Sequence, residues 1–227
     1  MKRHVAGALV GVAALLVPLL VSASPANGSV TGKVQVTRMG KPLADASGVV
    51  VYAVGFEQPP ATTVPTLLQK GAQFLPQMVA ITAGQKIDFP NMDKFFHNVF
   101  SLSKARSFDL GQYKKGSSKQ KAFPRTGIVE VYCNIHPKMN ATILVLPNRA
   151  FAFTTADGSF TLKDVPPGAW SVFAYSRRAP RPVRANNVAV VAGKKTVLSG
   201  LLIDETKLDF AHRNKYGEAY KARSSGY

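Results

Sequence analysis

The chain has 227 residues, of which 46% are hydrophobic, and it carries 29 Lys and Arg residues against 12 Asp and Glu residues, a formal net charge of +17. This length suffices for one large or two small domains. The basic excess predicts an acidic partner or surface, or a merely solvated surface. We do not expect nucleic acid as the partner, because stacking aromatic residues are not interleaved with the basic ones.

The N-terminus has the three parts of a secretory signal. A short basic head precedes an uncharged run, Val5–Val21, and small residues end at Ala23. We expect residues 1–23 to be cleaved and the mature chain, of about 204 residues (227 − 23), to be exported as a periplasmic or secreted protein. A retained membrane anchor is the alternative, against which the glycines and Pro18 of the run argue.

The remaining chain has the periodicity of β-strands. Apolar residues alternate with polar ones in short runs bounded by Gly, Pro, Asn and Asp, and no long segment has helical spacing. This pattern predicts an all-β fold of sandwiches or barrels. The predicted strands are Val30–Thr37, Gly48–Val54, Met78–Thr82, Lys86–Phe89, Asn98–Leu102, Gly127–Cys133, Ala141–Leu146, Ala150–Thr154, Ser159–Leu162, Ala169–Ser176, Asn187–Val191 and Thr196–Ile203.

Three segments interrupt the strand pattern. Glu57–Thr66 is rich in Pro and Thr and is predicted to be a linker or exposed loop. Ser103–Lys121 carries six basic residues among Gly and Ser and is predicted to be a solvated excursion. Residues 204–227 form a polar C-terminal tail, for which we expect one or two helical turns before the chain frays.

The only cysteine of the chain, Cys133, has no partner for an internal disulfide. An intermolecular disulfide, an inert buried thiol, a reactive nucleophile and a metal ligand are the remaining interpretations. The stretch YCNIHPKMN places Cys133, His136 and Met139 at three-residue intervals in a loop between two predicted strands. Because such a loop is held at both ends, it can direct three side chains to one point, which favours a metal site.

The ligand types indicate which metal this site would hold. A thiolate, an imidazole and a thioether are soft or borderline ligands, and a thioether selects copper over zinc or magnesium. Zinc would require further cysteines or histidines, which the chain lacks. A second imidazole can come only from His97, in FPNMDKFFHNVFS, because His4 leaves with the signal and His212 lies in the polar tail. Two histidines and a cysteine in a plane, with a weak axial methionine, are the blue-copper arrangement.

The segments GAQFLPQMVAITAGQKIDFPN, FFHNVFS and VEVYCNIHPKM resemble a cupredoxin of the plastocyanin and amicyanin kind, over about residues 67–147. The spacing Cys-x-x-His-x-x-Met is similar to the short ligand loop of amicyanins. The resemblance implies a Greek-key β-sandwich with one type 1 copper. It also implies that Asn98 hydrogen-bonds toward the cysteine sulfur and ties the two ligand segments together. The implied ligands are His97, Cys133 and His136 as equatorial ligands and Met139 as axial ligand.

The flanks of this region resemble a second domain. GSVTGKVQVTRMGKPLADASGVVVYAVG and TTADGSFTLKDVPPGAWSVFAYS are similar to the two halves of a carboxypeptidase regulatory-like (transthyretin-like) β-sandwich. The composite resembles exported bacterial proteins often labelled methylamine utilization proteins. We therefore expect residues 28–56 and 148–203 to form one discontinuous sandwich, with the cupredoxin domain, residues 57–147, inserted at a loop tip.

The predicted function is electron transfer between redox partners, without catalysis. Copper sequestration or delivery is an alternative, but Met39, Met78 and Met92 form no cluster in the sequence. A structural protein with a vestigial site is another, which the complete ligand set disfavours. A copper oxidase or nitrite reductase would need histidines for a second centre, and a Cys-His hydrolase would need an orienting carboxylate.

The resemblance also implies that His136 reaches the surface and is the exit for the electron. Lys94 and Lys138 are close to the ligands in the sequence, and the basic stretch Lys104–Arg125 lies between the two ligand segments. We expect these charges to surround the copper end and to attract an acidic redox partner, such as a cytochrome or a dehydrogenase. The alternatives are an even spread of charge or attachment to an anionic membrane surface.

Overall fold

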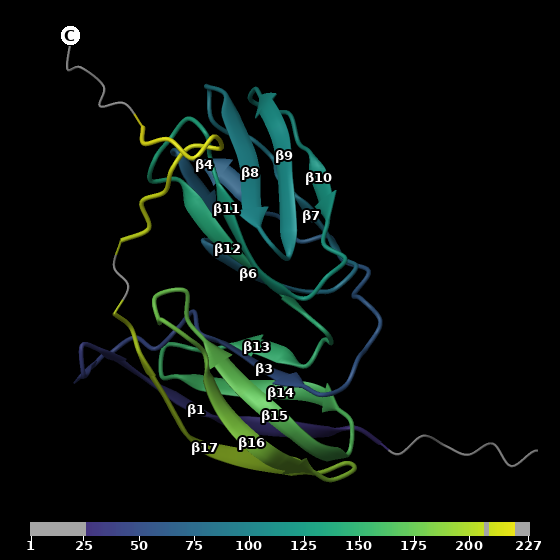
Figure 1. Cartoon of the computed structure of the whole chain (residues 1–227). Coiled ribbons are helices and arrows are strands. Elements are labelled where there is room, and N and C mark those ends of the chain that lie inside the picture. The colour runs from purple at the N-terminus through teal and green to yellow at the C-terminus, as the bar shows by residue number, and fades with distance from the viewer. Residues whose placement is uncertain (1–25, 207–208, 221–227) are drawn as a thin grey trace, which may run out of the picture.

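A computed structural model describes residues 26–206 and 209–220 (Figure 1). The predicted signal lies outside these residues. The described residues form seventeen strands and no helix, which confirms the prediction of an all-β fold. In this part of the chain there is accordingly no helix with the length and apolar character that a membrane span requires.

Each predicted strand overlaps a strand of the structure, and the strands fall into three groups along the chain. The first flank contains β1 (Gly28–Arg38), β2 (Lys41–Pro42) and β3 (Val50–Val54). The central region contains β4 (Leu68–Lys70), β5 (Gln73–Leu75), β6 (Met78–Thr82), β7 (Lys86–Asp88), β8 (His97–Ser103), β9 (Arg106–Tyr113), β10 (Gln120–Ala122), β11 (Gly127–Tyr132) and β12 (Asn140–Leu146). The last flank contains β13 (Phe151–Phe153), β14 (Ser159–Val165), β15 (Gly168–Tyr175), β16 (Val183–Val190) and β17 (Lys195–Asp204).

The two flanks pair with each other in two sheets, which form the lower unit in Figure 1. In one sheet β1 lies between β14, antiparallel to it, and β17, parallel to it. In the other sheet β3 lies between β13 and β15, and β16 forms the edge. Apolar side chains of both sheets, among them Val34, Val51, Val172 and Ile203, form one buried core. We call this unit the flank sandwich.

The central region forms the upper unit in Figure 1, built on a five-stranded sheet of order β6-β12-β11-β8-β9. Two short antiparallel pairs accompany this sheet, the hairpin β4-β5 and the pair β7-β10. Its core includes Phe74, Phe89, Phe123 and Ile143, all fully buried. We call this unit the central sandwich.

A third apolar cluster joins the two units. Met78, Ala80, Leu144 and Leu146 of β6 and β12 pack with Val50 and Tyr175 of the flank sandwich. Every residue of β12 is buried because its opposite faces meet different cores. A strand with both faces covered is largely apolar, as in the ATILVL stretch of β12, where Thr142 is the one polar residue.

The structure corrects two predictions about irregular segments. Ser103–Lys121 is not a solvated excursion, because it contains β9 and the start of β10, with Phe108 and Tyr113 buried. Strand β9 forms the edge of its sheet, where polar and charged side chains keep the edge from pairing with another molecule. The tail has no helical turn within residues 209–220, which instead lie against the central sandwich (Figure 1). The predicted linker Glu57–Thr66 contains no strand, as expected.

Candidate metal centre

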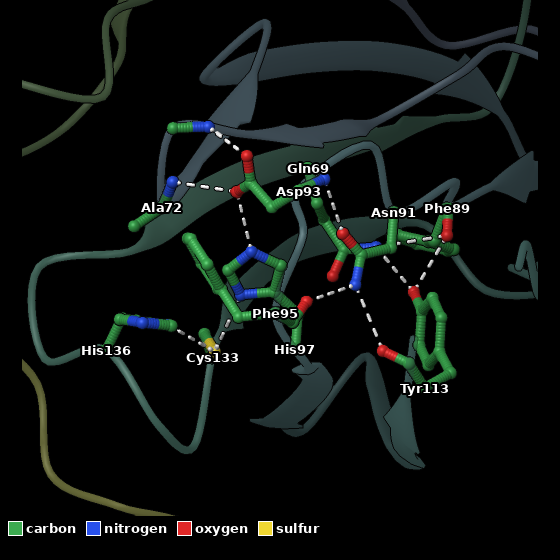
Figure 2. Close-up of polar contacts among 11 residues, drawn as sticks. Gln69, Ala72, Phe89, Asn91, Asp93, Phe95, His97, Tyr113, Cys133 and His136 are labelled. Atoms are coloured by element: carbon green, nitrogen blue, oxygen red, sulfur yellow. Dashed lines mark hydrogen bonds and ion pairs between the residues drawn. The ribbon is translucent and has the colours of Figure 1, made fainter. Parts of the chain in front are cut away.

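Three predicted ligands meet at one end of the central sandwich (Figure 2). His97 is the first residue of β8, Cys133 directly follows β11, and His136 lies in the loop before β12. The Cys133 Sγ atom lies 3.7 Å from His97 Nδ1 and 3.6 Å from His136 Nδ1. All three donor atoms lie within 4.8 Å of one another. Segments 36 residues apart in sequence thus present two imidazoles to one thiol.

The loop that carries the cysteine, residues 133–139, is closed on itself. Strands β11 and β12 are paired up to Tyr132 and Asn140, which fixes both ends of the loop. The Cys133 N–H donates to the Met139 carbonyl at 3.1 Å, and the Met139 N–H donates to the His136 carbonyl at 3.0 Å. Cys133 and Met139 are fully buried in the same apolar core. The fourth predicted ligand therefore belongs to the same closed loop and the same core as the thiol.

The surroundings of Cys133 favour the thiolate, the form that binds metals. Burial raises the pKa of the thiol, but hydrogen bonding with His97 and the backbone N–H groups of Asn98, Ile135 and His136 outweighs burial, and the net pKa is lowered. For His97, burial lowers the pKa, and the interactions with Cys133 and Asp93 outweigh it, so the net pKa is raised. The surroundings of Cys133 therefore favour a negative charge on the sulfur and a positive charge beside it.

Asp93 orients the His97 ring, and it was not among the predicted site residues. Its Oδ2 atom lies 2.8 Å from His97 Nε2 and accepts from the Ala72 N–H at 2.9 Å, while its Oδ1 atom accepts from the Gly71 N–H at 2.7 Å. Gly71 and Ala72 form the two-residue turn between β4 and β5, and both have positive φ, as a tight hairpin turn requires. Hydrogen bonds from Ala72, His97 and Gly71 outweigh burial and lower the Asp93 pKa.

An ionised Asp93 can only accept, so the hydrogen bond places the proton of a neutral His97 on Nε2. The lone pair of Nδ1 then faces the thiol. A carboxylate behind a ligating imidazole is a common means of fixing the tautomer and orientation of the ring and of raising its basicity. Asp93 occupies the position of such a carboxylate relative to His97.

The segment between β7 and β8 places an aromatic ring beside both imidazoles. The Asn91 side chain donates from Nδ2 to the carbonyl groups of Phe95 and Tyr113, both at 3.0 Å, and accepts from the Asp93 N–H at 2.9 Å. This fixed backbone puts the Phe95 ring centre 5.0 Å from that of His97 and 5.4 Å from that of His136 (Figure 2). Phe95 therefore covers the imidazoles on one side.

The remaining predicted residues have different positions. Asn98 does reach the cysteine, but through its backbone N–H, while its side chain donates to Asp109 Oδ1 at 2.6 Å. His212 is not part of the donor cluster among the described residues, and its ring instead stacks on Tyr132 at 4.4 Å.

The donor set fits a copper ion. Separations of 3.6 and 3.7 Å between sulfur and nitrogen leave room for an ion at metal–N and metal–S distances of about 2.0 to 2.3 Å. One thiolate, two imidazoles and a nearby thioether are the ligands of blue-copper sites, whereas structural zinc takes Cys and His alone.

Several solved structures resemble part of the chain. A purple cupredoxin from Nitrosopumilus maritimus is 20% identical, with a TM-score of 0.32, over 36% of this chain and 98% of that one. A reduced amicyanin mutant is 15% identical, with a TM-score of 0.35, over 42% of this chain and 97% of that one. The Cu-containing nitrite reductase NirK from Thermus scotoductus SA-01 is 23% identical, with a TM-score of 0.35, over 41% of this chain and 25% of that one. No protein-family model and no curated protein matches the chain.

Proposed function

We propose that this chain is an exported type 1 copper protein that carries single electrons between redox partners and is not an enzyme. One observation carries the proposal, namely the convergence within 4.8 Å of a donor atom of His97 on β8 and the donor atoms of Cys133 and His136 in the closed loop, which also contains the buried Met139. The sequence resemblance to cupredoxins supports it independently.

Bound copper would supply the one-electron couple, and the protein would supply a fixed set of donors. Asp93 holds the ring of His97, and backbone N–H groups stabilise the thiolate of Cys133. Phe95 and the buried core around Met139 limit the access of water. Because the donors are placed before the ion binds, they need little movement when the oxidation state changes.

A route for the electron is available at His136. This residue is partly exposed, and with Phe95, Phe96 and Ile135 it lines an open hollow of about 490 Å³. Phe95 and Phe96 are 46% and 53% exposed, an unusual pair of surface rings. An apolar patch around the exit ligand suits brief contact with a redox partner, since exposed aromatic rings mark interaction sites. Lys94 and Lys138 are exposed beside this patch.

The test is to add one equivalent of copper(II) to the purified protein and record absorption and EPR spectra. We expect an intense blue thiolate-to-copper band and a small parallel hyperfine splitting. Cys133→Ser should abolish the band, and Met139→Leu should keep copper but alter the reduction potential. A colourless complex with the spectrum of ordinary tetragonal copper would refute the proposal. A blue complex that passes copper rapidly to an apo-acceptor would instead favour copper delivery.

A further inference from the structure

The ligand loop is held from outside the central sandwich by two elements that the proposed function does not require. One is Arg177, which follows β15 of the flank sandwich, and the other is the C-terminal segment, residues 209–220. Their contacts fall on residues next to the predicted copper ligands.

At the end of the loop, the contact point is Asn140, which follows Met139 and is buried. Its Nδ2 atom donates to the Lys138 carbonyl at 2.9 Å and to the Phe210 carbonyl at 3.1 Å. Its Oδ1 atom accepts a hydrogen bond from Arg177 Nη2. A single amide therefore joins the ligand loop, the C-terminal segment and the flank sandwich.

The Arg177 side chain is held in place by its surroundings. Its guanidinium lies 4.2 Å from the centre of the Phe210 ring, and its Nε and Nη1 atoms are buried and have no hydrogen-bond partner among the described residues. Burial lowers the pKa of the Arg177 guanidinium. Tyr175, two residues earlier, is buried in the cluster that joins the two sandwiches, so the position of Arg177 is fixed relative to β12. A desolvated guanidinium with this geometry differs from an exposed, mobile arginine, whose contacts contribute little.

At the start of the loop, the C-terminal segment makes three contacts. The Tyr220 hydroxyl donates to the Cys133 carbonyl at 2.7 Å, and the Lys215 N–H donates to Asn134 Oδ1 at 2.8 Å. The His212 ring stacks on Tyr132 at 4.4 Å, with an angle of 28° between the rings. The residues before, at and after the thiol are thus all contacted.

The same segment also reaches the strand of the first histidine. Lys215 Nζ lies 2.7 Å from Asp109 Oδ2, and Asp109 Oδ1 accepts from the Asn98 side chain at 2.6 Å. Asn98 directly follows His97. The segment is therefore connected to both chain regions that provide donors.

We propose that Arg177 and the C-terminal segment form a clasp that positions the ligand loop and thereby controls copper retention and the geometry of the site. The clasp gives the flank sandwich a part in the metal centre, since Arg177 belongs to it. This inference rests on the proposed copper function. A loop held at both ends keeps its donors in one arrangement, and loss of outer contacts of this kind lowers metal affinity by about 10- to 100-fold.

The test uses two substitutions with matched controls. Arg177→Met removes the bond to Asn140. Its control is Arg184→Met, because Arg184 likewise lies over a ring, Phe173, but its hydrogen bond goes to Ser171 of the flank sandwich. Tyr220→Phe removes the hydroxyl that donates to the Cys133 carbonyl and also lies 3.4 Å from His212 Nδ1. Its control is Tyr216→Phe in the same segment, where Tyr216 is 72% exposed. Hydrogen exchange of residues 133–140 in the copper-free chain and the rate of copper release to a chelator are measured for all four.

We expect Arg177→Met and Tyr220→Phe to speed both loop exchange and copper release, with release about tenfold faster. The parallel hyperfine splitting should increase, because a freed loop lets copper(II) approach the tetragonal geometry that it prefers. The controls should match the wild type. Exchange and release at wild-type rates in both test variants would overturn the clasp. If the wild type gives no blue spectrum while loop exchange still rises only in the test variants, the proposed copper function is wrong. The inference that these contacts position the loop is then still supported.

Discussion

At the scale of single residues, the arrangement around His97 explains how one imidazole is fixed before any ion binds. Asp93 accepts a hydrogen bond from the Nε2–H group of His97 and is itself held by hydrogen bonds from the Gly71 and Ala72 N–H groups. A neutral asparagine at this position would have one acceptor oxygen instead of two and would carry no negative charge. The negative charge behind the ring should favour copper(II) over copper(I), because it stabilises the more positive ion.

We therefore expect Asp93→Asn to raise the reduction potential. The shift should be about 60 mV for each tenfold loss of copper(II) affinity relative to copper(I). Redox titration followed by the blue absorption measures it. The control is Asp45→Asn, because Asp45 also accepts a backbone N–H, from Ser47 at 2.9 Å, but lies in an exposed turn of the flank sandwich. An unchanged potential in Asp93→Asn would show that the carboxylate has no influence on the site.

The candidate donor residues are easier to recognise in the sequence than the residues that hold them in place. Cys133, His136 and Met139 are recognisable because their spacing is local and because a thiol, an imidazole and a thioether together are typical ligands of copper. Asp93 is an ordinary residue in a turn, and its role depends on the β4–β5 hairpin more than 20 residues away in sequence. The only signal in the sequence was a carboxylate four residues before His97, and aspartate is common in turns for reasons of backbone geometry alone.

At the scale of elements, β9 shows why an edge strand was missed. Its sequence, RSFDLGQY, alternates imperfectly, and lysines precede and follow it. Only Phe108 and Tyr113 of this strand are buried, while its other residues lie on the surface or partly so. Composition therefore indicated a solvated segment, although pairing with β8 supplies the backbone hydrogen bonds. The fully buried strands β6 and β12 were evident because the residues on both of their faces are mostly apolar.

We expect Phe108→Ala to destabilise the central sandwich strongly. The Phe108 ring packs at 6.2 Å from Phe89 and 5.9 Å from Phe123, and truncation of a buried phenylalanine costs about 3 to 5 kcal/mol of unfolding free energy. Leu102→Ala is the control, since Leu102 is 62% exposed on the neighbouring strand and its loss should cost no more than about 0.5 kcal/mol. Urea unfolding followed by circular dichroism gives both values. Equal, small effects would mean that residues 106–113 do not form a packed strand.

At the scale of the whole molecule, the metal centre depends on contacts between distant parts of the chain. Tyr220 and Cys133 are 87 residues apart, and Lys215 and Asp109 are 106 apart. No periodicity or motif in a polar tail predicts where it docks, because the docking is decided by a few side-chain contacts. The tail was expected to fray, yet its described residues cover one side of the ligand loop.

The net charge of +17 is also a property of the whole molecule. Whether it attracts a partner to one site depends on where the charged side chains lie. Lys94 and Lys138 are exposed beside the hollow at His136. Lys215, by contrast, is paired with Asp109 and contributes less to the outer field. An exposed basic rim around an apolar patch attracts an acidic partner and then allows close contact, and such attraction is screened beyond about 8 Å at physiological ionic strength.

We therefore expect the reduced protein to transfer electrons faster to an acidic acceptor than to a basic acceptor of similar potential. Stopped-flow oxidation across a series of salt concentrations measures this, and the advantage should vanish as salt rises. Lys94→Glu and Lys138→Glu should each lower the rate of electron transfer to the acidic acceptor on the order of several-fold at low salt. Neither substitution should change the blue spectrum. Lys163→Glu makes the same charge change on β14 of the flank sandwich and should have little effect, because this side chain is exposed on the other unit. If all three substitutions slow the reaction equally, the attraction comes from net charge alone, and the rim at His136 does not select the partner.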